Sequence, residues 1–332
     1  MKTVILDQPG HFTLTSTPQP GAPQADEVLA RVLTVGICGT DLHAFEGTQP
    51  FFTYPRILGH ELAIEVIESN SPDFQPRDRC AVNPYMTCGV CAACRVGRSN
   101  CCAKMRVIGV HSDGGMRDRI VIPAAQLYKC EKLAPMLIPL VETLGVGIHA
   151  TGRAQVQPGD RAIVCGAGPI GLSVIEFLKL AGADIGVVEK IPERLAFAQK
   201  HCGLTRAYPS HDEAKQEQAS VLVFDCTGDR GSMEASIHLL EQGGKLIFVG
   251  LINDQVSLFD PDLHRREATI LASRNSTPAE HHRVLELMES GAIDVRAWPT
   301  DFVAPEAMAE KFPLWLHRQA GVVKAVIDWA RE

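Results

Sequence analysis

Residues 161–189 read RAIVCGAGPIGLSVIEFLKLAGADIGVVE, and this stretch decides the class of fold. It predicts a short apolar strand at 161–165, a glycine-rich turn at 166–171, an apolar-periodic helix and a second strand at 185–188 that leads into Glu189. A bare G-x-G-x-x-G pattern is weak evidence. Here the strand, the helix, the second strand and the terminal acid all stand where a dinucleotide-binding βαβ unit requires them.

The glycines of this stretch divide the work of holding a pyrophosphate. Gly166 permits the tight turn, Gly168 lets the backbone approach the phosphates, and Gly171 allows the helix to pack closely on the sheet. Pro169 and Ile170 complete the motif at the start of the helix, whose unpaired N–H groups and positive dipole attract phosphate.

Glu189 predicts the choice of dinucleotide. Its carboxylate can accept hydrogen bonds from the ribose hydroxyls of NAD and would repel the additional phosphate of NADP. Lys190 and Arg194 could offset that repulsion, so NADP stays open as the alternative. Arg194 could instead lie flat near the adenine, and both cations could simply be solvated at the start of a helix. For the βαβ unit as a whole, the alternative is a Rossmann-like methyltransferase.

Three more strands are expected, at 221–224, 245–249 and 270–273, with a helix at about 232–240 between the first two. Alternating strands and helices indicate a doubly wound parallel sheet and an α/β fold. Cofactor contacts in such sheets lie at the carboxyl ends of the strands. The residues expected there are Thr227, Gly228, Val249, Gly250, Leu251 and Ser273.

Composition excludes several classes of protein. The chain has 332 residues, enough for roughly two domains, with 45% apolar and 21% charged residues. The formal net charge is 32 − 39 = −7, so no basic excess points to nucleic acid. No apolar run approaches the length of a membrane span or a signal peptide. We therefore expect a soluble protein of the cytoplasm.

Eleven cysteines in an intracellular chain suggest metal binding rather than disulfides. The segment 88–102 reads CGVCAACRVGRSNCC, and four thiolates so close together can enclose one tetrahedral, structural zinc ion. Cys101 stands next to the last of them and could take its place. Free surface thiols or a redox-active pair are the alternatives. The predicted ligands are Cys88, Cys91, Cys94 and Cys102.

A second metal set is more dispersed. Cys38 is followed 22 residues later by His60 and Glu61. A thiol, an imidazole and a carboxylate are a plausible three-ligand set that leaves a position open for substrate or water. The spacing alone leaves open the alternative that Cys38 and His60 pack in the protein interior and bind no metal.

Together these motifs resemble the zinc-dependent medium-chain dehydrogenases, the superfamily of alcohol and sorbitol dehydrogenases. The resemblance covers nearly the whole chain and rests on ICGTDLH at 37–43, GHE at 59–61, the cysteine lobe, GAGPIG and IFVGL at 247–251. It implies a discontinuous GroES-like β-barrel catalytic domain over 1–141 and 275–332, with a Rossmann domain at 142–274. Strand-like runs at 3–6, 28–35 and 63–67 fit this independently. Two zinc ions per chain are implied, one catalytic and one structural.

The resemblance also implies roles for individual residues. Cys38 and His60 match catalytic zinc ligands, and Glu61 matches an acidic neighbour that ligates directly in sorbitol-dehydrogenase-like members. Glu142 matches a further carboxylate that ligates zinc or holds the zinc-bound water. The alternative for Glu142 is an acid that caps a helix.

Proton release is expected through Thr40 and His43. Thr40 resembles the hydroxyl that begins a proton relay in the family. His43 can pass the proton to water because the pKa of an unperturbed histidine lies near neutrality. The alternative for His43 is an ordinary surface histidine.

The substrate is expected to be a secondary alcohol, and the local strings GTQPFFTYPRILGHE, RVIGVHSDGG and FDPDLHRREATILASRNSTPAE resemble a bacterial group that oxidises the sugar acids L-galactonate and L-gulonate. Arg274 could bind a carboxylate through its planar fork, while Asn275 and His111 could read hydroxyls. Arg56 and Arg106 are further carboxylate candidates, with internal salt bridges as the alternative for each arginine.

The chain also departs from the family pattern. Ile64 stands where a glycine is usual, which puts the local backbone in question. Ala44 and Asn275 replace tyrosines that border the substrate in sorbitol dehydrogenase, so that pocket is not reproduced.

Other functions stay open. An uncharged polyol such as sorbitol or galactitol is the alternative substrate, and L-threonine is a third. A binding protein without chemistry, or a zinc-free quinone reductase, would have no need of Cys38, Thr40, His60 and Glu61 together. We expect a small polyhydroxy substrate, a homodimer or homotetramer with the strand at 245–249 and its neighbours near the interface, and neither nucleic acid nor membrane as a partner.

Overall fold

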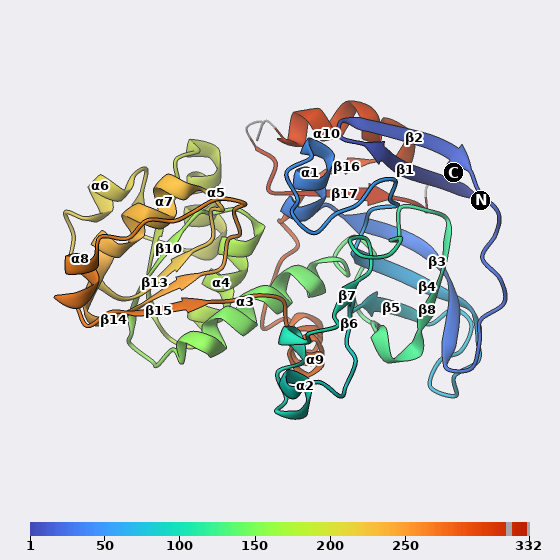
Figure 1. Cartoon of the computed structure of the whole chain (residues 1–332), viewed down its shortest axis with the longest axis horizontal. Coiled ribbons are helices and arrows are strands. Elements are labelled where there is room, and N and C mark those ends of the chain that lie inside the picture. Colours follow the sequence, from blue (N-terminus) through green and yellow to red (C-terminus); the bar gives the residue numbers. More distant parts are fainter. Residues whose placement is uncertain (317–320, 331–332) are drawn as a thin grey trace. The chain divides into compact units, whose positions relative to one another are not determined.

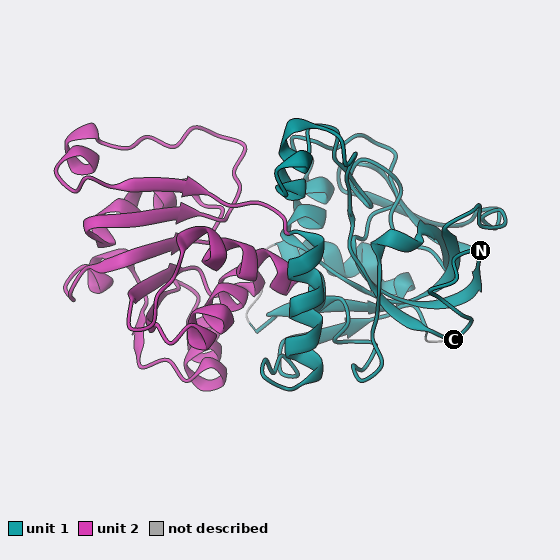
Figure 2. Ribbon diagram, turned by 90° about the horizontal axis from the view of Figure 1, so that it is seen from below, with its two compact units in different colours: residues 1–142, 277–332 teal, residues 143–276 magenta. Residues whose placement is uncertain are grey.

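A computed structural model describes residues 1–316 and 321–330. The chain forms two compact units, one of residues 1–142 and 277–332 and one of residues 143–276 (Figure 2). The second unit is therefore an insertion within the first, and each is described by itself. None of the helices in the described part of the chain combines the length and the apolar character needed to cross a membrane.

The inserted unit is built on a six-stranded parallel sheet with the strand order β12-β11-β10-β13-β14-β15, of which β10, β13, β14 and β15 are labelled in Figure 1. This is the order of a doubly wound dinucleotide-binding sheet, so the predicted class of fold is confirmed. Its strands are β10 (Arg161–Cys165), β11 (Asp184–Val188), β12 (Arg206–Tyr208), β13 (Ser220–Asp225), β14 (Leu240–Phe248) and β15 (Thr269–Ala272). Its helices are α3 (Leu140–Ala154, which begins in the first unit), α4 (Pro169–Leu180), α5 (Pro192–Cys202), α6 (His211–Ala214), α7 (Arg230–Ala235), η3 (Ser236–Leu239) and α8 (Asp260–His264).

One boundary in this sheet differs from the prediction. The expected helix at 232–240 ends at Leu239 in a 3₁₀ turn, and Leu240 is already the first residue of β14, paired with Ser220 of β13. The register then shifts, because Gly243 adopts a positive φ of 72° and interrupts the ladder before Lys245. The strand at 245–249 is also not outermost, since β14 lies between β13 and β15 and the edge strands are β12 and β15.

The first unit is dominated by β structure. A seven-stranded sheet has the order β16-β17-β3-β4-β5-β9, and β8 also pairs with β3. All its pairs are antiparallel except β16 with β17. The strands are β3 (Glu27–Gly36), β4 (Glu61–Ser69), β5 (Arg79–Val82), β8 (Arg119–Pro123), β9 (Leu127–Lys129), β16 (Pro299–Val303) and β17 (Lys324–Asp328). The strands predicted at 28–35 and 63–67 are confirmed.

Smaller elements surround this sheet. Two two-stranded antiparallel sheets pair β1 (Lys2–Gln8) with β2 (His11–Ser16), and β6 (Tyr85–Met86) with β7 (Arg106–Val107). The strand predicted at 3–6 lies within β1. The helices are α1 (Gly39–Glu46), α2 (Ala92–Arg95), η1 (Ser99–Cys101), η2 (Ala124–Gln126), α9 (Pro278–Glu289), η4 (Pro305–Ala307) and α10 (Met308–Leu316).

Ile64 sits in the main hydrophobic core of this unit. It has no exposed surface, and in β4 it pairs with Val32 of β3 and Cys80 of β5. A branched side chain suits this pleated, buried position, and the register between β3 and β4 shifts directly beside it, between Val32 and Thr34.

Candidate active site

The dispersed set of Cys38, His60 and Glu61 comes together in the first unit. Gly36 at the end of β3 pairs with Glu61 at the start of β4, which brings the turn before α1 beside the GHE sequence. One ligand atom from each of the three residues lies within 4.8 Å of the others. His60 and Glu61 are buried, and Cys38 is half-buried.

Asp41 completes the surroundings of this cluster. Its Oδ2 accepts a hydrogen bond of 2.9 Å from the Cys38 N–H, and its Oδ1 lies 3.5 Å from Nδ1 of His60. Neither that oxygen nor that nitrogen has a hydrogen-bond partner among the described residues, although both are buried. Carboxylates commonly orient metal-ligating imidazoles in this way.

The electrostatics of the cluster favour a cation. Burial lowers the pKa of His60, but Asp41 and the Cys38 thiol outweigh burial and hold that pKa well above its ordinary value. Surroundings that favour a positive charge on the imidazole also favour a metal ion beside it. The thiol, imidazole and carboxylate donors therefore fit zinc.

Glu61 has a buried counter-ion. Its Oε1 lies 2.5 Å from Nζ of Lys324 in β17, and both side chains are 1% exposed. Burial lowers the pKa of Lys324, but Glu61 more than compensates, so the pKa of the ammonium group is raised. A Cβ on Gly36 would lie 2.2 Å from the Glu61 carboxylate, so only glycine leaves room for it.

Glu142 lies at the start of α3, outside the three-ligand cluster. It is buried and accepts a short hydrogen bond from the Tyr85 hydroxyl. Burial, and secondarily Glu142, raise the pKa of Tyr85 far above its ordinary value, so Tyr85 keeps its proton and donates it. Burial raises the pKa of Glu142, with smaller and opposite electrostatic effects from His60, which lowers it, and Glu61, which raises it.

The two residues expected to release the proton lie on α1. Thr40 is half-buried in the first turn, and His43 is exposed three residues later on the same side of the helix. Nδ1 of His43 lies 3.3 Å from the Thr48 hydroxyl.

The cysteine lobe brings four thiols together. One Sγ–Sγ distance of 3.5 Å joins Cys91 to Cys94 and another joins Cys88 to Cys102. All four sulfurs lie within 4.8 Å of one another, while Cys101 is outside the cluster. Backbone N–H groups lower the pKa of Cys91 to about 6, whereas desolvation raises the pKa of Cys94 to about 12. Four sulfur ligands at these distances fit tetrahedral zinc, whose charge would favour their thiolate forms.

In the inserted unit, the glycine-rich loop has the geometry of a phosphate cradle. Gly166 has a φ of 94°, and a Cβ on Gly171 would lie 1.8 Å from the Gly166 carbonyl oxygen. A Cβ on Gly168 would meet open space, with only Nη1 of Arg194 within 4 Å. Gly168 precedes α4, whose first residues are Pro169 and Ile170. The loop thus leaves its open side where a pyrophosphate would approach the helix N-terminus.

Glu189 is fixed beside this loop. Its carboxylate accepts hydrogen bonds of 2.9 Å from the Ala167 N–H and 2.8 Å from the Ile191 N–H. It is 7% exposed. Nζ of Lys190 lies 4.0 Å from the carboxylate of Asp229 and is largely exposed.

Asp225, at the carboxyl end of β13, organises the neighbouring loops. Its carboxylate accepts hydrogen bonds from the hydroxyls of Thr227, Ser232 and Ser236. Ligand atoms of Cys165 and His211 also lie within 4.8 Å of it, but hydroxyl donors already occupy both carboxylate oxygens. The buried carboxylate of Asp225 therefore holds the loop that carries Thr227 and Gly228, two of the expected cofactor contacts.

The other expected cofactor contacts also lie at strand ends. Backbone N–H groups of Val249 and Gly250 donate to the Asp225 carbonyl, and Leu251 is 58% exposed. A Cβ on Gly250 would lie 2.5 Å from the Gly228 nitrogen, so the two loops approach closely. The Ser273 hydroxyl is buried at the end of β15 and has no partner among the described residues, which fits a polar group of a bound dinucleotide.

The residues expected to bind substrate are divided between the two units. Arg274 is exposed and Asn275 has a positive φ of 54°, both in the inserted unit. His111, in the first unit, accepts a hydrogen bond from the Val107 N–H. Arg106 is exposed, and Arg56 pairs with Asp113, which realises the alternative expected for that arginine.

Sequence reasoning missed Asp41, Tyr85 and Lys324. Asp41 carries a signal, because an acid three residues after the residue that begins a helix is typical of a capping box, and that box is present here. Tyr85 and Lys324 lie 57 and 263 residues from their partners, and no local pattern marks them.

Comparisons with known proteins agree with this arrangement. Residues 24–135 match the alcohol dehydrogenase GroES-like domain, and residues 169–290 match the zinc-binding dehydrogenase family. The chain is 34% identical to L-galactonate-5-dehydrogenase of Escherichia coli K12 over 99% of both chains.

Two solved structures cover nearly all of the chain. An alcohol dehydrogenase from E. coli CFT073, complexed with NADH, has a TM-score of 0.89 at 25% identity and covers 99% of both chains. A zinc-binding dehydrogenase from Sinorhizobium meliloti 1021, bound to NADP, has a TM-score of 0.89 at 27% identity over 98% of both. The chain belongs to the zinc-dependent medium-chain dehydrogenases and is an oxidoreductase of the zinc alcohol dehydrogenase type, with a GroES-like and a Rossmann-like domain.

Proposed function

We propose that this protein oxidises a secondary alcohol of a sugar acid and transfers the hydride to NAD, with Cys38, His60 and Glu61 as ligands of a catalytic zinc ion. The observation that carries the proposal is the convergence of these three donors within 4.8 Å, two of them buried and Cys38 half-buried, beside an Asp41 oxygen and a His60 nitrogen that lack hydrogen-bond partners among the described residues. A zinc ion held there would supply Lewis acidity that lowers the pKa of an alcohol, and the nicotinamide would accept the hydride.

The chain's own residues hold the zinc ligands in place and move the proton of the substrate. Asp41 fixes the His60 ring, and Lys324 fixes Glu61. Thr40 accepts the proton released by the alcohol and passes it toward His43, which is exposed and can deliver it to water.

Glu142 serves this site as a hydrogen-bond acceptor. Tyr85 donates to one of its oxygens and so holds the carboxyl in place. We propose that the other oxygen accepts from a water or a substrate hydroxyl, with direct ligation of zinc as the alternative.

The catalytic metal can be tested by metal analysis. Wild-type protein is expected to hold two zinc ions per chain, and Cys38→Ser is expected to hold one. Retention of both ions in that variant would refute the assignment of Cys38. Cys101→Ser is the control, because Cys101 lies outside both clusters.

The preference for NAD is proposed on Glu189. Its carboxylate is pinned by two backbone N–H groups and cannot swing away from an additional phosphate. Glu189→Gln keeps the shape and removes the charge, so it is expected to lower the ratio of kcat/KM with NAD to that with NADP. Glu193→Gln, exposed in the first turn of α5, is the control. An unchanged ratio in Glu189→Gln counts against this role.

The choice of a sugar acid rests on the relative named L-galactonate-5-dehydrogenase, together with an exposed arginine as the carboxylate contact. Arg274 is proposed as the carboxylate contact because it is exposed and its planar fork matches a carboxylate, with Asn275 and His111 for hydroxyls. NAD reduction is to be measured with L-galactonate, L-gulonate, sorbitol, galactitol and L-threonine. Activity confined to the uncharged polyols or to threonine would overturn the proposal.

A matched pair of variants tests the carboxylate contact. Arg274→Ala is expected to raise KM for the sugar acid by about tenfold or more, the loss typical of a charge-assisted hydrogen bond. Arg265→Ala, also exposed in the inserted unit, is expected to leave KM unchanged.

We further propose that the first unit is the catalytic domain and the inserted unit the NAD domain, close to the expected boundaries of 1–141 with 275–332 and 142–274.

A homodimer or homotetramer is proposed through the edge strand β15, where Ile270 is 41% exposed. A cytoplasmic location is proposed because a chain with eleven cysteines, five of them proposed zinc ligands, suits a reducing compartment. Light scattering measures the assembly.

A further inference from the structure

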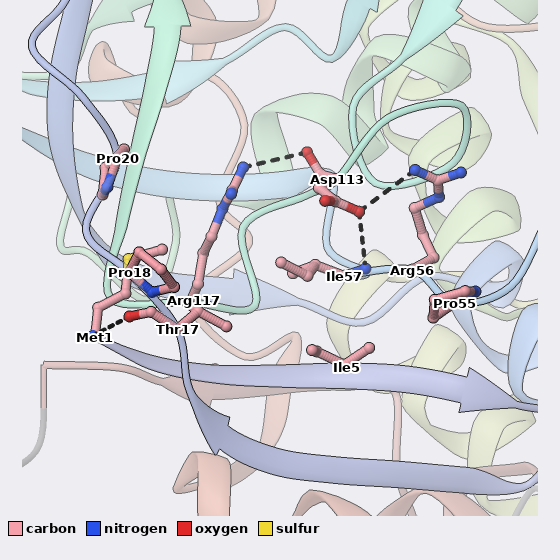
Figure 3. Close-up of a pocket in the computed structure, with 10 residues that line it drawn as sticks. All are labelled: Met1, Ile5, Thr17, Pro18, Pro20, Pro55, Arg56, Ile57, Asp113 and Arg117. Carbon is pink, nitrogen blue, oxygen red and sulfur yellow. Dashed lines mark hydrogen bonds and ion pairs between the residues drawn. The ribbon is translucent and has the colours of Figure 1, made fainter.

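A cavity of about 320 Å³ lies in the first unit, and none of the residues assigned to zinc or to proton transfer lines it (Figure 3). Its walls come from β1, from the segment 17–20, and from the loops around Arg56 and Asp113. Small-molecule pockets in proteins begin at about this size.

Arg117 enters this cavity with its hydrogen-bonding capacity almost unused. The guanidinium group has five N–H donors, yet among the described residues it makes a single long hydrogen bond, 3.5 Å from Nη2 to the Asp113 carbonyl oxygen. Its Nε is buried and has no partner among the described residues. No carboxylate in the described part of the chain lies within 4.0 Å of this cation.

Burial lowers the pKa of Arg117, and Asp113 offsets that effect only in part. A guanidinium group nevertheless stays charged in proteins. Arg117 is therefore a half-buried positive charge without an ion-pair partner within 4.0 Å in the described part of the chain, and an anion at this position would compensate the cost of its partial burial.

Arg56 faces the same space from the other side of Asp113 (Figure 3). Its Nη1 lies 3.4 Å from Oδ1 of Asp113, and its Nη2 donates to the Thr53 hydroxyl at 2.9 Å. The same Asp113 oxygen also accepts from the Ile57 N–H at 3.2 Å. The Nε atom of Arg56, like that of Arg117, is buried and has no hydrogen-bond partner among the described residues.

The charges that line the cavity do not balance. Two guanidinium groups share one carboxylate, and that carboxylate is directed at Arg56 and at a backbone N–H rather than at Arg117. The remaining walls include Ile5, Ile57 and several prolines, which are apolar and concentrate the field of the cations.

We propose that this cavity is a binding site for a small anion, with a carboxylate or phosphate group held between Arg117 and Arg56. Arginine presents paired donors that match the oxygens of either group. The apolar walls suit a short hydrocarbon body next to the charged end. The site is separate from the proposed dehydrogenase chemistry and does not depend on it.

Isothermal titration calorimetry on the zinc-loaded protein tests the proposal. Saturating NAD is included so that the glycine-rich loop cannot bind the probe. Succinate and inorganic phosphate are the probes, and butane-1,4-diol is the uncharged counterpart of succinate. Ionic strength is held constant with sodium chloride. We expect saturable binding of at least one anion and none of the diol, and the two anions compared show which group the site prefers.

Variants locate the binding. Arg117→Met is expected to weaken the anion by about tenfold or more, since it removes a charge-assisted contact. Arg119→Met is the matched control, because Arg119 is exposed two residues later and does not line the cavity. Asp113→Asn keeps an acceptor for Ile57 but removes the competing charge, so it is expected to tighten binding severalfold.

Three results would overturn the site. They are the absence of saturable binding by both anions, equal weakening in Arg117→Met and Arg119→Met, and an affinity in Asp113→Asn that is unchanged or lower. If Arg117→Met does not fold, the opposite shift expected for Asp113→Asn still decides the question.

Discussion

Replacing Lys324 by methionine tests how the metal cluster is held together. The ammonium group is 1% exposed and lies against a carboxylate that is equally buried. Removing one partner of a buried ion pair leaves the other charge without compensation, which costs about 3–5 kcal/mol of folding free energy. Lys324→Met should therefore destabilise the first unit by about that amount in protein treated with a chelator.

Zinc changes the expected size of this effect. A zinc ion at Glu61 would stand close to the carboxylate and replace part of the charge that Lys324 provides. The loss of stability should be smaller in zinc-loaded protein, and by linkage the variant should bind zinc more tightly than the wild type.

The assay is urea unfolding followed by tryptophan fluorescence. The chain contains three tryptophans, Trp298, Trp315 and Trp329, and all are buried in the first unit. The signal therefore reports this unit without interference from the inserted one.

A double-mutant cycle with Glu61→Gln isolates the pair. The double variant should recover most of the stability lost in Lys324→Met, with a coupling of at least about 2 kcal/mol. A coupling below about 0.5 kcal/mol, or an equal loss with and without zinc, would refute the reasoning.

Three further predictions concern acid stability, cofactor binding and the cysteine lobe. Burial lowers the pKa of His281 to about 4. Its contribution to the free energy of unfolding is therefore fully present above the unfolded pKa of about 6.5 and falls by about 3 kcal/mol as the pH drops to 4. The free energy of unfolding, measured by tryptophan fluorescence, should depend less steeply on pH in His281→Leu than in the wild type, while His282→Leu, at an exposed neighbour, should keep the wild-type slope. Gly171→Ala would place a Cβ 1.8 Å from a loop carbonyl, so it should weaken NAD at least tenfold by fluorescence titration, and an unchanged affinity contradicts the close packing. Cys102→Ser should lose one zinc ion per chain, and equal zinc content in Cys102→Ser and wild type would exclude Cys102 as a ligand.

Local sequence was sufficient for the inserted unit. Its βαβ core depends on neighbouring residues, since Gly166, Gly171 and Glu189 meet within one continuous stretch. The error at 232–240 had a physical cause, because an apolar helical period continues into Leu240 while the glycines after it allow an irregular strand. Periodicity does not show where one element gives way to the next.

The first unit was harder to predict because its contacts are distant in sequence. The ligand pattern at Cys38, His60 and Glu61 was visible, but Lys324 reaches Glu61 only when β17 pairs with β3. Arg56 was expected near a substrate carboxylate, and the structure places it in a cavity lined by none of the proposed zinc ligands, beside a second arginine with no predicted role. Tertiary packing decides which arginine pairs with a carboxylate, and amino-acid composition does not predict this pairing.

The position of β17 in the sheet has a consequence for synthesis on the ribosome. This strand lies between β16 and β3, yet it is made after the whole inserted unit. The inserted unit can therefore fold while the first unit is still missing an internal strand. Until residue 324 has left the exit tunnel, the nascent chain carries Glu61 without its ammonium partner, so an early supply of zinc would substitute for a charge that is still to be translated.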